Sequence, residues 1–278
     1  MVINSSLTVL VLALVASVSC HPKITGRIVN GTITDIERFP FAVSIRRPDG
    51  THLCGSSIIA PSWLLTAAHC AKGRTASETK VQYGTATIGV QGENIAQVKR
   101  IIIHEQYNPS KNFLNDIALL ELEEALVYNY KNIAPVTLPK PRFEIHQVPK
   151  GAPGVLIGWG YNGTHEETQD TLHSVDLKIY SDNECSRRHE KRTTSHQICA
   201  GVDEGWKGQC GGDSGGPLLY SGSIQVGIVS WSTRPCTLPP FPGVFTKTCS
   251  DNRNRKTFCK FNFNFCSGNI YFFTITND

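Results

Sequence analysis

Short apolar runs separated by turn-forming residues make up most of the chain. The runs are rich in β-branched residues, and glycine, proline, asparagine and aspartate separate them, which is typical of β-strands. Alternation of apolar and polar positions is clear at Val175, Leu177 and Ile179. Ser221-Gly222 lies between two runs and predicts a hairpin turn. We expect strands at residues 53–59, 63–66, 98–103, 117–122, 155–159, 175–179 and 224–230.

No long run has the spacing of an amphipathic helix, so the pattern predicts an all-β fold. Many short strands with turn signals indicate a sandwich or a barrel, and the pattern alone does not choose between them. The chain has 278 residues, which is enough for one large or two small packed units.

The N-terminus departs from this pattern. Residues 7–18 form an uncharged apolar run, about as long as the core of a secretory signal and too short to span a bilayer. Small residues follow, so we expect a signal peptide over residues 1–20, cleaved after Ser19 or Cys20. A buried first strand is the alternative. No other stretch is apolar enough to predict a membrane anchor.

Charge and cysteine content narrow the compartment and the partners. The net charge is +4 and no broad basic stretch indicates nucleic-acid binding. The chain has ten cysteines and no Cys-x-x-Cys pair, which favours disulfides in a secreted, extracellular protein over zinc binding. Two weak glycosylation motifs, at Asn30 and Asn162, agree with export.

The stretch Gly211-Gly212-Asp213-Ser214-Gly215-Gly216-Pro217 carries the strongest chemical signal. Glycines around a serine let the backbone approach a substrate closely and let its N–H groups converge on one oxygen. Acyl transfer needs such donors where the carbonyl gains negative charge. A glycine-rich loop with a passive serine is the alternative.

A serine nucleophile needs a base, and His69 is the best candidate. It follows an apolar run in Thr66-Ala67-Ala68-His69-Cys70, where a cysteine bridge could fix it in place. Asp116 stands before another apolar run, where a buried carboxylate needs a donor such as an imidazole N–H. Alone, Asp116 could equally cap a turn. Histidines in less constrained surroundings are His104, His146, His165, His173, His189 and His196.

Together these segments resemble the chymotrypsin-like serine protease family from residue 28 to about 247. The order His, Asp, Ser is that of the family. Further matching motifs are Ile28-Val29-Asn30-Gly31, Asp116-Ile117-Ala118-Leu119, Gly158-Trp159-Gly160, Ser230-Trp231-Ser232 and Pro242-Gly243-Val244.

The resemblance implies two six-stranded antiparallel β-barrels with the active site in the cleft between them. His69 and Asp116 would come from the first barrel and Ser214 from the second. The N–H groups of Gly212 and Ser214 would form the oxyanion hole, and residues 230–232 would pair with the substrate backbone. The implied disulfides are Cys54–Cys70, Cys185–Cys199 and Cys210–Cys236.

The resemblance also implies a precursor. Arg27 precedes Ile28 as in a tryptic cut site, and the new ammonium of Ile28 would pair with Asp213 to shape the oxyanion hole and the specificity pocket. Breaking such a buried pair costs about 3–5 kcal/mol, so we expect the uncut chain to be nearly inactive.

By the same resemblance, the specificity pocket should have Gly208 at its base and Ser232 and Gly243 in its walls, and Ser230 and Trp231 should also bind the substrate through the backbone edge at 230–232. None of these is acidic, so a cationic side chain would enter unpaired. The pocket is similar to that of insect-type chymotrypsins, and we expect cleavage after large apolar or aromatic residues. An elastase-like preference for smaller residues is the alternative.

The resemblance ends abruptly at Thr248. The domains we expect are a signal peptide (1–20), an activation propeptide (21–27), a peptidase domain (28–247) and an atypical tail (248–278). The tail is rich in Asn, Phe and Cys, adds Cys249, Cys259 and Cys266, and lacks the family's terminal amphipathic helix. A variant or mispredicted gene end and a genuine lineage-specific tail are the two explanations. Residues 260–265 alternate with a period of two, which is typical of an amphipathic strand. A disordered or sticky tail is the alternative.

We therefore expect a monomeric, secreted serine endopeptidase with no cofactor and no metal site. Its partners would be protein or peptide substrates, an activating trypsin-like protease and protein protease inhibitors. A catalytically inactive homologue that acts as a binding protein is the alternative class.

Overall fold

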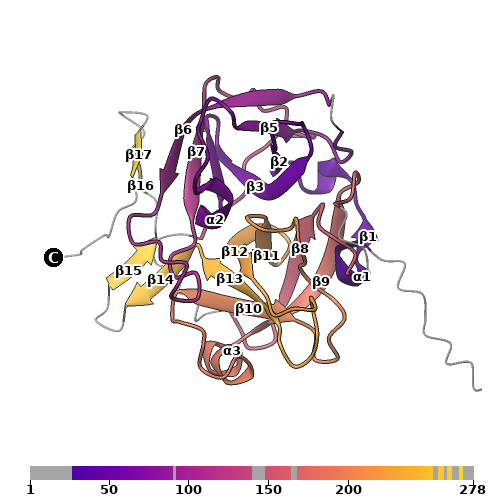
Figure 1. The fold of residues 1–278 in the computed structure, drawn as a ribbon, viewed down its shortest axis with the longest axis vertical. Coiled ribbons are helices and arrows are strands. Elements are labelled where there is room, and N and C mark those ends of the chain that lie inside the picture. Colours follow the sequence, from indigo (N-terminus) through magenta and orange to yellow (C-terminus); the bar gives the residue numbers. More distant parts are fainter. Residues whose placement is uncertain are drawn as a thin grey trace, which may run out of the picture.

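The computed structural model describes residues 27–89, 92–139, 148–163, 168–252, 256–259, 262–264 and 269–271. Two β-barrels fill most of this part, one made by the first half of the chain and one by the second (Figure 1). The two six-stranded antiparallel barrels that the resemblance implied are confirmed. The expected signal peptide and residues 21–26 of the propeptide lie outside the described residues.

The first barrel is closed by six strands in the order β2-β3-β4-β7-β6-β5. Its interior is aliphatic and aromatic, with Ile58, Leu64 and Leu119 fully buried. Burial of such side chains contributes about 1.5–3 kcal/mol each. The strands are β2 (Ala42–Arg46), β3 (His52–Ala60), β4 (Trp63–Thr66), β5 (Lys80–Tyr83), β6 (Ile95–Ile103) and β7 (Ala118–Leu122).

The second barrel runs β9-β10-β13-β12-β11-β8 and closes through the pairing of β8 with β9, while β1 extends it on β9. Ser221 and Gly222 both have positive φ between β11 and β12, so the predicted hairpin is confirmed. The strands are β1 (Thr32–Ile33), β8 (Pro153–Gly158), β9 (His173–Tyr180), β10 (Gln197–Gly201), β11 (Pro217–Tyr220), β12 (Ile224–Trp231) and β13 (Gly243–Lys247).

Helical structure is short. The chain has a turn at α1 (Arg27–Asn30), a 3-10 turn η1 (Ile36–Arg38), one turn at α2 (Ala68–Ala71) and the seven-residue α3 (Asp182–Arg188). The hydrophobic pattern did not predict α3. Its N-terminus is capped by Ser181, whose side chain accepts a hydrogen bond from the Glu184 amide at 3.3 Å.

Hydrogen bonds cross from one barrel to the other at several points. The Gly55 amide donates to the Ser214 carbonyl at 2.8 Å, and Ser57 Oγ donates to Gln225 Oε1 at 2.6 Å. Gln197 Nε2 donates to the Asn112 carbonyl at 2.7 Å. These bonds fix the two barrels relative to each other.

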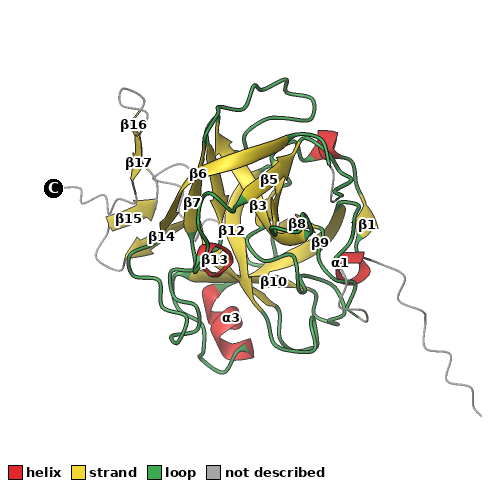
Figure 2. Cartoon of the chain, turned by 45° about the horizontal axis from the view of Figure 1, so that its top comes forward, coloured by secondary structure: helices red, strands yellow, loops and turns green. Residues whose placement is uncertain are grey.

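The described part of the tail forms two small hairpins beside the barrels rather than a terminal helix (Figure 2). They pair β14 (Cys249–Asn252) with β15 (Lys256–Cys259), and β16 (Asn262–Asn264) with β17 (Asn269–Tyr271). Cys266 lies outside the described residues. No helix in the described ranges is long and apolar enough to cross a membrane.

Candidate active site

The pairing of β4 with β7 brings His69 and Asp116 together. Thr66, at the end of β4, pairs with Ala118, at the start of the antiparallel β7. The residues just after β4 and just before β7 therefore leave the barrel side by side. His69 Nδ1 lies 2.7 Å from Asp116 Oδ2, and the His69 amide donates to Asp116 Oδ1 at 2.9 Å.

Asp116 is fully buried, and its carboxylate accepts hydrogen bonds from protein donors. Besides His69, Ser230 Oγ donates to its Oδ2 at 2.6 Å. Three donors on one carboxylate offset the cost of burying its charge. Burial and this negative charge together raise the pKa of the nearby Tyr107 to about 12.

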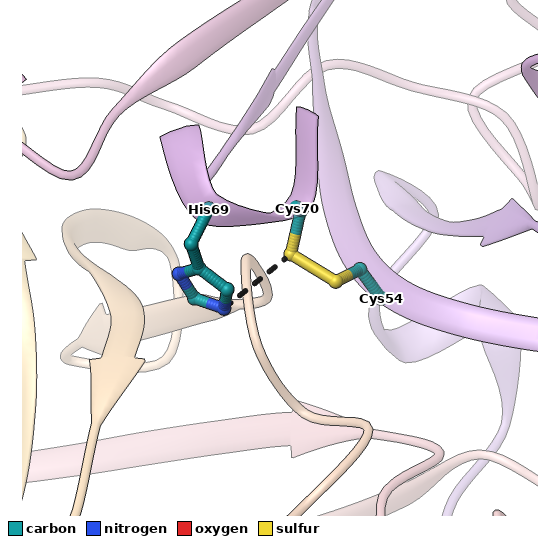
Figure 3. A group of neighbouring side chains, drawn as sticks. All are labelled: Cys54, His69 and Cys70. Atoms are coloured by element: carbon teal, nitrogen blue, oxygen red, sulfur yellow. Dashed lines mark hydrogen bonds between the residues drawn. A yellow bond between two sulfur atoms is a disulfide. The ribbon is translucent and has the colours of Figure 1, made fainter. Parts of the chain in front are cut away.

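The His69 ring is held on two further sides. Its side chain is 23% exposed, and its edge-to-face contact with Phe113 has ring centroids 5.7 Å apart. Nε2 lies 3.7 Å from Cys70 Sγ (Figure 3). Cys70 is in a disulfide with Cys54, so this cluster of two sulfurs and an imidazole offers no thiolate to a metal ion.

Ser214 reaches the same place from the second barrel. Pro217 at the start of β11 pairs with Ile228 of β12, so the segments containing Ser214 and Ser230 leave that barrel together. A side chain at Gly215 would collide with Thr66 Oγ1 and the Gly55 carbonyl oxygen. This close approach presses the serine loop onto the strand that leads to His69.

Within the described residues no hydrogen bond joins Ser214 Oγ to His69 Nε2, whose contact there is with Cys70 Sγ. Catalytic hydrogen bonds often tighten only when substrate is bound. Backbone contacts, and not a side-chain bond, therefore hold the Ser214 loop against β3 and the end of β4 that leads to His69.

The buried His52 holds the serine loop, a role that no local sequence pattern indicated. Its Nε2 lies 2.8 Å from the Gly212 carbonyl oxygen and its Nδ1 lies 2.7 Å from Ser44 Oγ. A carbonyl only accepts, so Nε2 donates and Nδ1 accepts from the hydroxyl. Burial lowers the pKa of His52 to about 4, which keeps it neutral.

Asp213 is buried among backbone donors. Its carboxylate accepts hydrogen bonds from the Gly160 and Cys210 amides, each at 2.9 Å. Desolvation nevertheless raises its pKa to about 7. Ile28 is fully buried, and Val29 next to it pairs with Gly208 through a bond from the Gly208 amide to the Val29 carbonyl at 3.2 Å.

Comparison with known proteins identifies relatives of this chain. Residues 28–253 match the Trypsin family. The chain is 38% identical to a trypsin of Simulium vittatum over 241 residues, covering 84% of this chain and 94% of the relative. It is 37% identical to Serine protease 1 of Rattus norvegicus over 247 residues, covering 87% and 94%. Trypsin zeta of Drosophila erecta is 37% identical over 238 residues, covering 79% and 81%.

The chain belongs to the trypsin family of serine endopeptidases. The expectation of a chymotrypsin-fold serine protease is confirmed. The family acts on peptide bonds, so this protease has peptide substrates.

The disulfides of the protease join the expected partners Cys54–Cys70, Cys185–Cys199 and Cys210–Cys236. The last links the serine loop to the segment after β12. Such bonds are consistent with export. Of the two glycosylation motifs, Asn30 is exposed and Asn162 is partly buried, while Thr164 of the second motif lies outside the described residues.

The residues expected to form the specificity pocket lie on neighbouring elements of the protease. Trp231 of β12 pairs with Val244 of β13, which places Ser232 and Gly243 next to this pair. Gly208 lies on the Val29 bridge. Sequence reasoning missed Gln209, whose Nε2 donates to the Trp231 carbonyl at 2.8 Å.

Proposed function

We propose that this protein is a secreted serine endopeptidase, made as a precursor that is cut after Arg27. Ser214 is the nucleophile, His69 its general base and Asp116 the carboxylate that orients the base. The preferred cleavage follows large apolar or aromatic residues. The hydrogen-bonded His69–Asp116–Ser230 group, against which the Ser214 loop is packed, carries the proposal.

Asp116 fixes the protonation of His69. The Asp116 carboxylate accepts a hydrogen bond from His69 Nδ1, so the neutral ring carries its proton on Nδ1. The lone pair of Nε2 is then free to act as the base. Ser214 Oγ attacks the carbonyl carbon of the substrate and its proton passes to His69 Nε2. The C–N bond then breaks as Nε2 returns the proton to the leaving amine, and water releases the acyl group by the same steps.

The negative charge that forms on the carbonyl oxygen needs donors, and Gly212 and Ser214 would supply them from the backbone. Gly212 has φ of 90°, which favours glycine. His52 holds the peptide group between Gly212 and Asp213. Losing one such donor typically lowers the rate about 10²–10³-fold.

Activation of the precursor would depend on Asp213, which would pair with the new N-terminus. A buried carboxylate with a raised pKa is a site that gains from a positive charge. Cleavage after Arg27 creates an ammonium at Ile28, which is already buried in this structure. Pairing of the two ions would hold Asp213 ionised and fix the oxyanion loop on its N-terminal side.

The same segment reaches the pocket. Val29 pairs with Gly208, so the position of the new N-terminus and the position of the pocket base are joined by one hydrogen bond. A misplaced segment 28–29 would therefore disturb substrate binding as well as the oxyanion hole. This supports a precursor with little activity.

Gly208, Ser232 and Gly243 support the preference for apolar residues, because none of them carries a charge to meet lysine or arginine. Two of the relatives are named trypsin, which suggests the alternative preference for cleavage after lysine or arginine. An elastase-like preference for small residues is the second alternative, since Ser232 takes some of the width that a glycine would leave.

The backbone of Ser230, Trp231 and Ser232 suits an extended substrate. β12 pairs with β11 up to Ile228 and then continues to Trp231, past the start of β11. A peptide in extended conformation could add to this edge by main-chain hydrogen bonds. It would then place its scissile bond against Ser214.

We propose a signal peptide at 1–20, a propeptide at 21–27, a peptidase domain at 28–247 and a tail at 248–278. The mature protein would be monomeric, would be glycosylated at Asn30 and Asn162, and would meet an activating trypsin-like protease and protein protease inhibitors.

A fluorophosphonate probe tests the proposal. The secreted precursor is incubated with the probe before and after cleavage at Arg27, and labelled peptides are identified by mass spectrometry. We expect labelling of Ser214 only after cleavage, none in Ser214→Ala, and none in Arg27→Gln treated with the same activator. A cut chain that takes no label would support the inactive binding homologue, and fastest cleavage after arginine would refute the pocket assignment.

A further inference from the structure

The asparagines of the two glycosylation motifs are far apart in the sequence, but the fold brings both of them next to the same residue. Asn30 directly follows Val29 in the chain. Asn162 directly precedes Gly163, and a Cβ placed on Gly163 would lie 3.1 Å from Val29 Cγ2. Both motif asparagines therefore border the segment that follows the proposed cut after Arg27.

Asn30 is the first side chain after the proposed cut that faces solvent. Ile28 and Val29 are 0% and 3% exposed, whereas Asn30 is exposed. The Gly31 amide donates to the Ile28 carbonyl at 2.7 Å and closes a turn in which Asn30 has a φ of 60°. Asparagine tolerates this left-handed backbone better than most residues. A glycan on Asn30 is therefore compatible with the buried positions of Ile28 and Val29.

Asn162 borders the same segment from the loop between β8 and β9, and it is partly exposed. The neighbouring Gly163 has a φ of 87°, a backbone that favours glycine. Its lack of a side chain lets this loop pack closely on Val29. A glycan on Asn162 would therefore start beside the place where the segment enters the fold.

N-glycosylation adds a bulky, hydrophilic group to such asparagines. The donor is a lipid-linked oligosaccharide of the secretory pathway. The amide nitrogen forms a bond to C1 of N-acetylglucosamine, the bond from C1 to the lipid pyrophosphate breaks, and the amide loses one proton. The carrier lipid leaves as its pyrophosphate.

We propose that glycans on Asn30 and Asn162 shield the activation segment and slow the cleavage after Arg27. This inference rests on the proposed function, because it concerns the regulation of the same cut. Ile28 and Val29 are buried in this structure, so the segment has to leave its place before an activating protease binds it in extended conformation.

The size of a protease contact supports the shield. Asn30 is the third residue after the cut bond, which places it about 10 Å away in an extended chain. A standard protease interface covers about 800 Å² on each partner, a patch with a radius of about 16 Å. The first sugar on Asn30 would therefore lie inside the contact. The glycan on Asn162 would act from the neighbouring loop, so we expect its effect to be the smaller one.

The test uses the secreted full-length precursor, made in cells that add N-glycans, and a trypsin-class protease as the activator. Glycan occupancy and the release of a chain that begins at Ile28 are both followed by mass spectrometry. Thr32→Val removes the motif at Asn30 while keeping the asparagine itself. We expect this variant to be cut about tenfold faster than the wild type, since its barrier is lower by about 1.4 kcal/mol. Asn162→Gln should be cut faster by a smaller factor.

Thr32→Ser is the matched control, because it preserves the motif, and at equal glycan occupancy it should be cut at the wild-type rate. If Thr32→Val is not secreted, the wild type alone decides: trimming each glycan to one sugar with an endoglycosidase should speed the cut. An Asn30 without a glycan, or an unchanged rate after the motif is removed or the glycans are trimmed, overturns the shield. An unchanged rate in Asn162→Gln overturns the part of Asn162. The release of Ile28 is measured without enzyme activity, so a cut chain that takes no fluorophosphonate label would instead overturn the proposed function.

Discussion

Ser230 Oγ donates a 2.6 Å hydrogen bond to Asp116 Oδ2, the oxygen that also faces His69 Nδ1. The second barrel therefore helps to orient the carboxylate of the first. Ser230→Ala removes one of three donors and leaves Asp116 less well fixed. We expect kcat to fall about tenfold with KM little changed, as measured with a peptide amide and active-site titration.

Ser110→Ala, in an exposed turn, is the control and should leave kcat unchanged. The effect of Ser230→Ala should remain far smaller than that of Asp116→Asn, which disturbs the His69 tautomer and costs about 10⁴-fold in this type of site. Equal losses in the two variants would show that the Ser230 bond is indispensable and would contradict this reading.

His52 should make the folded state sensitive to acid. Its folded pKa of about 4 lies below the ordinary 6.5, because burial disfavours the charged ring and Arg46 and Arg47 add to the effect. Its contribution to stability is therefore complete above pH 6.5 and is lost as the pH falls toward 4. His52→Gln can still donate to Gly212 but does not titrate, so urea unfolding should show a smaller loss of stability across this window.

His52→Phe tests the positioning role of the same residue. It cannot donate to the Gly212 carbonyl, so we expect kcat/KM to fall about tenfold while His52→Gln stays near the wild type. Equal activity of the phenylalanine and glutamine variants would show that the bond does not position the oxyanion loop.

In the uncut chain, Asp213 should give folding stability the opposite pH dependence to that of His52. Its folded pKa of about 7 exceeds the ordinary 3.8, so its favourable contribution is present below pH 3.8 and is lost as the pH rises through 7. We compare Arg27→Gln with Arg27→Gln/Asp213→Asn by urea unfolding. The difference between the two free energies of unfolding should change by several kcal/mol between pH 4 and 7, favouring the Asn variant at pH 7.

The cut wild-type protease should lose this dependence, because an ammonium at Ile28 holds Asp213 ionised. Asp213→Asn should then destabilise the cut protein at pH 7. The same sign before and after cleavage would show that Ile28 does not pair with Asp213.

The tail offers a prediction about cysteines. Cys249 and Cys259 are directly opposite in the antiparallel pairing of β14 with β15. Opposite residues of an antiparallel pair have Cα atoms about 4.5–5.5 Å apart, within the range of about 4.4–6.8 Å found for disulfide-bonded residues. We expect peptide mapping without reductant to recover Cys249 linked to Cys259, with two electrons passed to a disulfide oxidant. In Cys259→Ser an extra thiol should react with iodoacetamide, whereas a Cys266 link to either residue would contradict the register.

All seven strands expected from the hydrophobic pattern overlap strands of the structure, and the family was recognisable from short motifs. The proposed catalytic residues Ser214, His69 and Asp116 lie in short motifs of distinctive composition, so they could be proposed without the fold. β10 was missed because its five buried residues include Gln197 and Gly201 and show no alternation. The short α3 carries no apolar repeat, and its only signal was the Ser181–Glu184 capping pattern.

Residues that act through partners distant in sequence were not predictable. His52 matters because it bonds Gly212, which lies 160 residues later. Gln209 stands beside the expected pocket base, yet nothing in its neighbours indicates that its amide bonds the Trp231 carbonyl, which lies 22 residues later. Tertiary contacts decide both roles, and a single sequence does not encode such contacts in any local pattern.

The bonds from Gly55 to Ser214 and from Ser230 to Asp116 run in opposite directions across the boundary between the barrels. Each barrel thus supplies a fixed point for a proposed catalytic residue that belongs to the other. Neither half of the chain by itself fixes the positions of both the proposed nucleophile and its proposed base. Catalytic competence is consequently a cooperative property of the whole fold, and it disappears with the first barrel to open, even while the other remains intact.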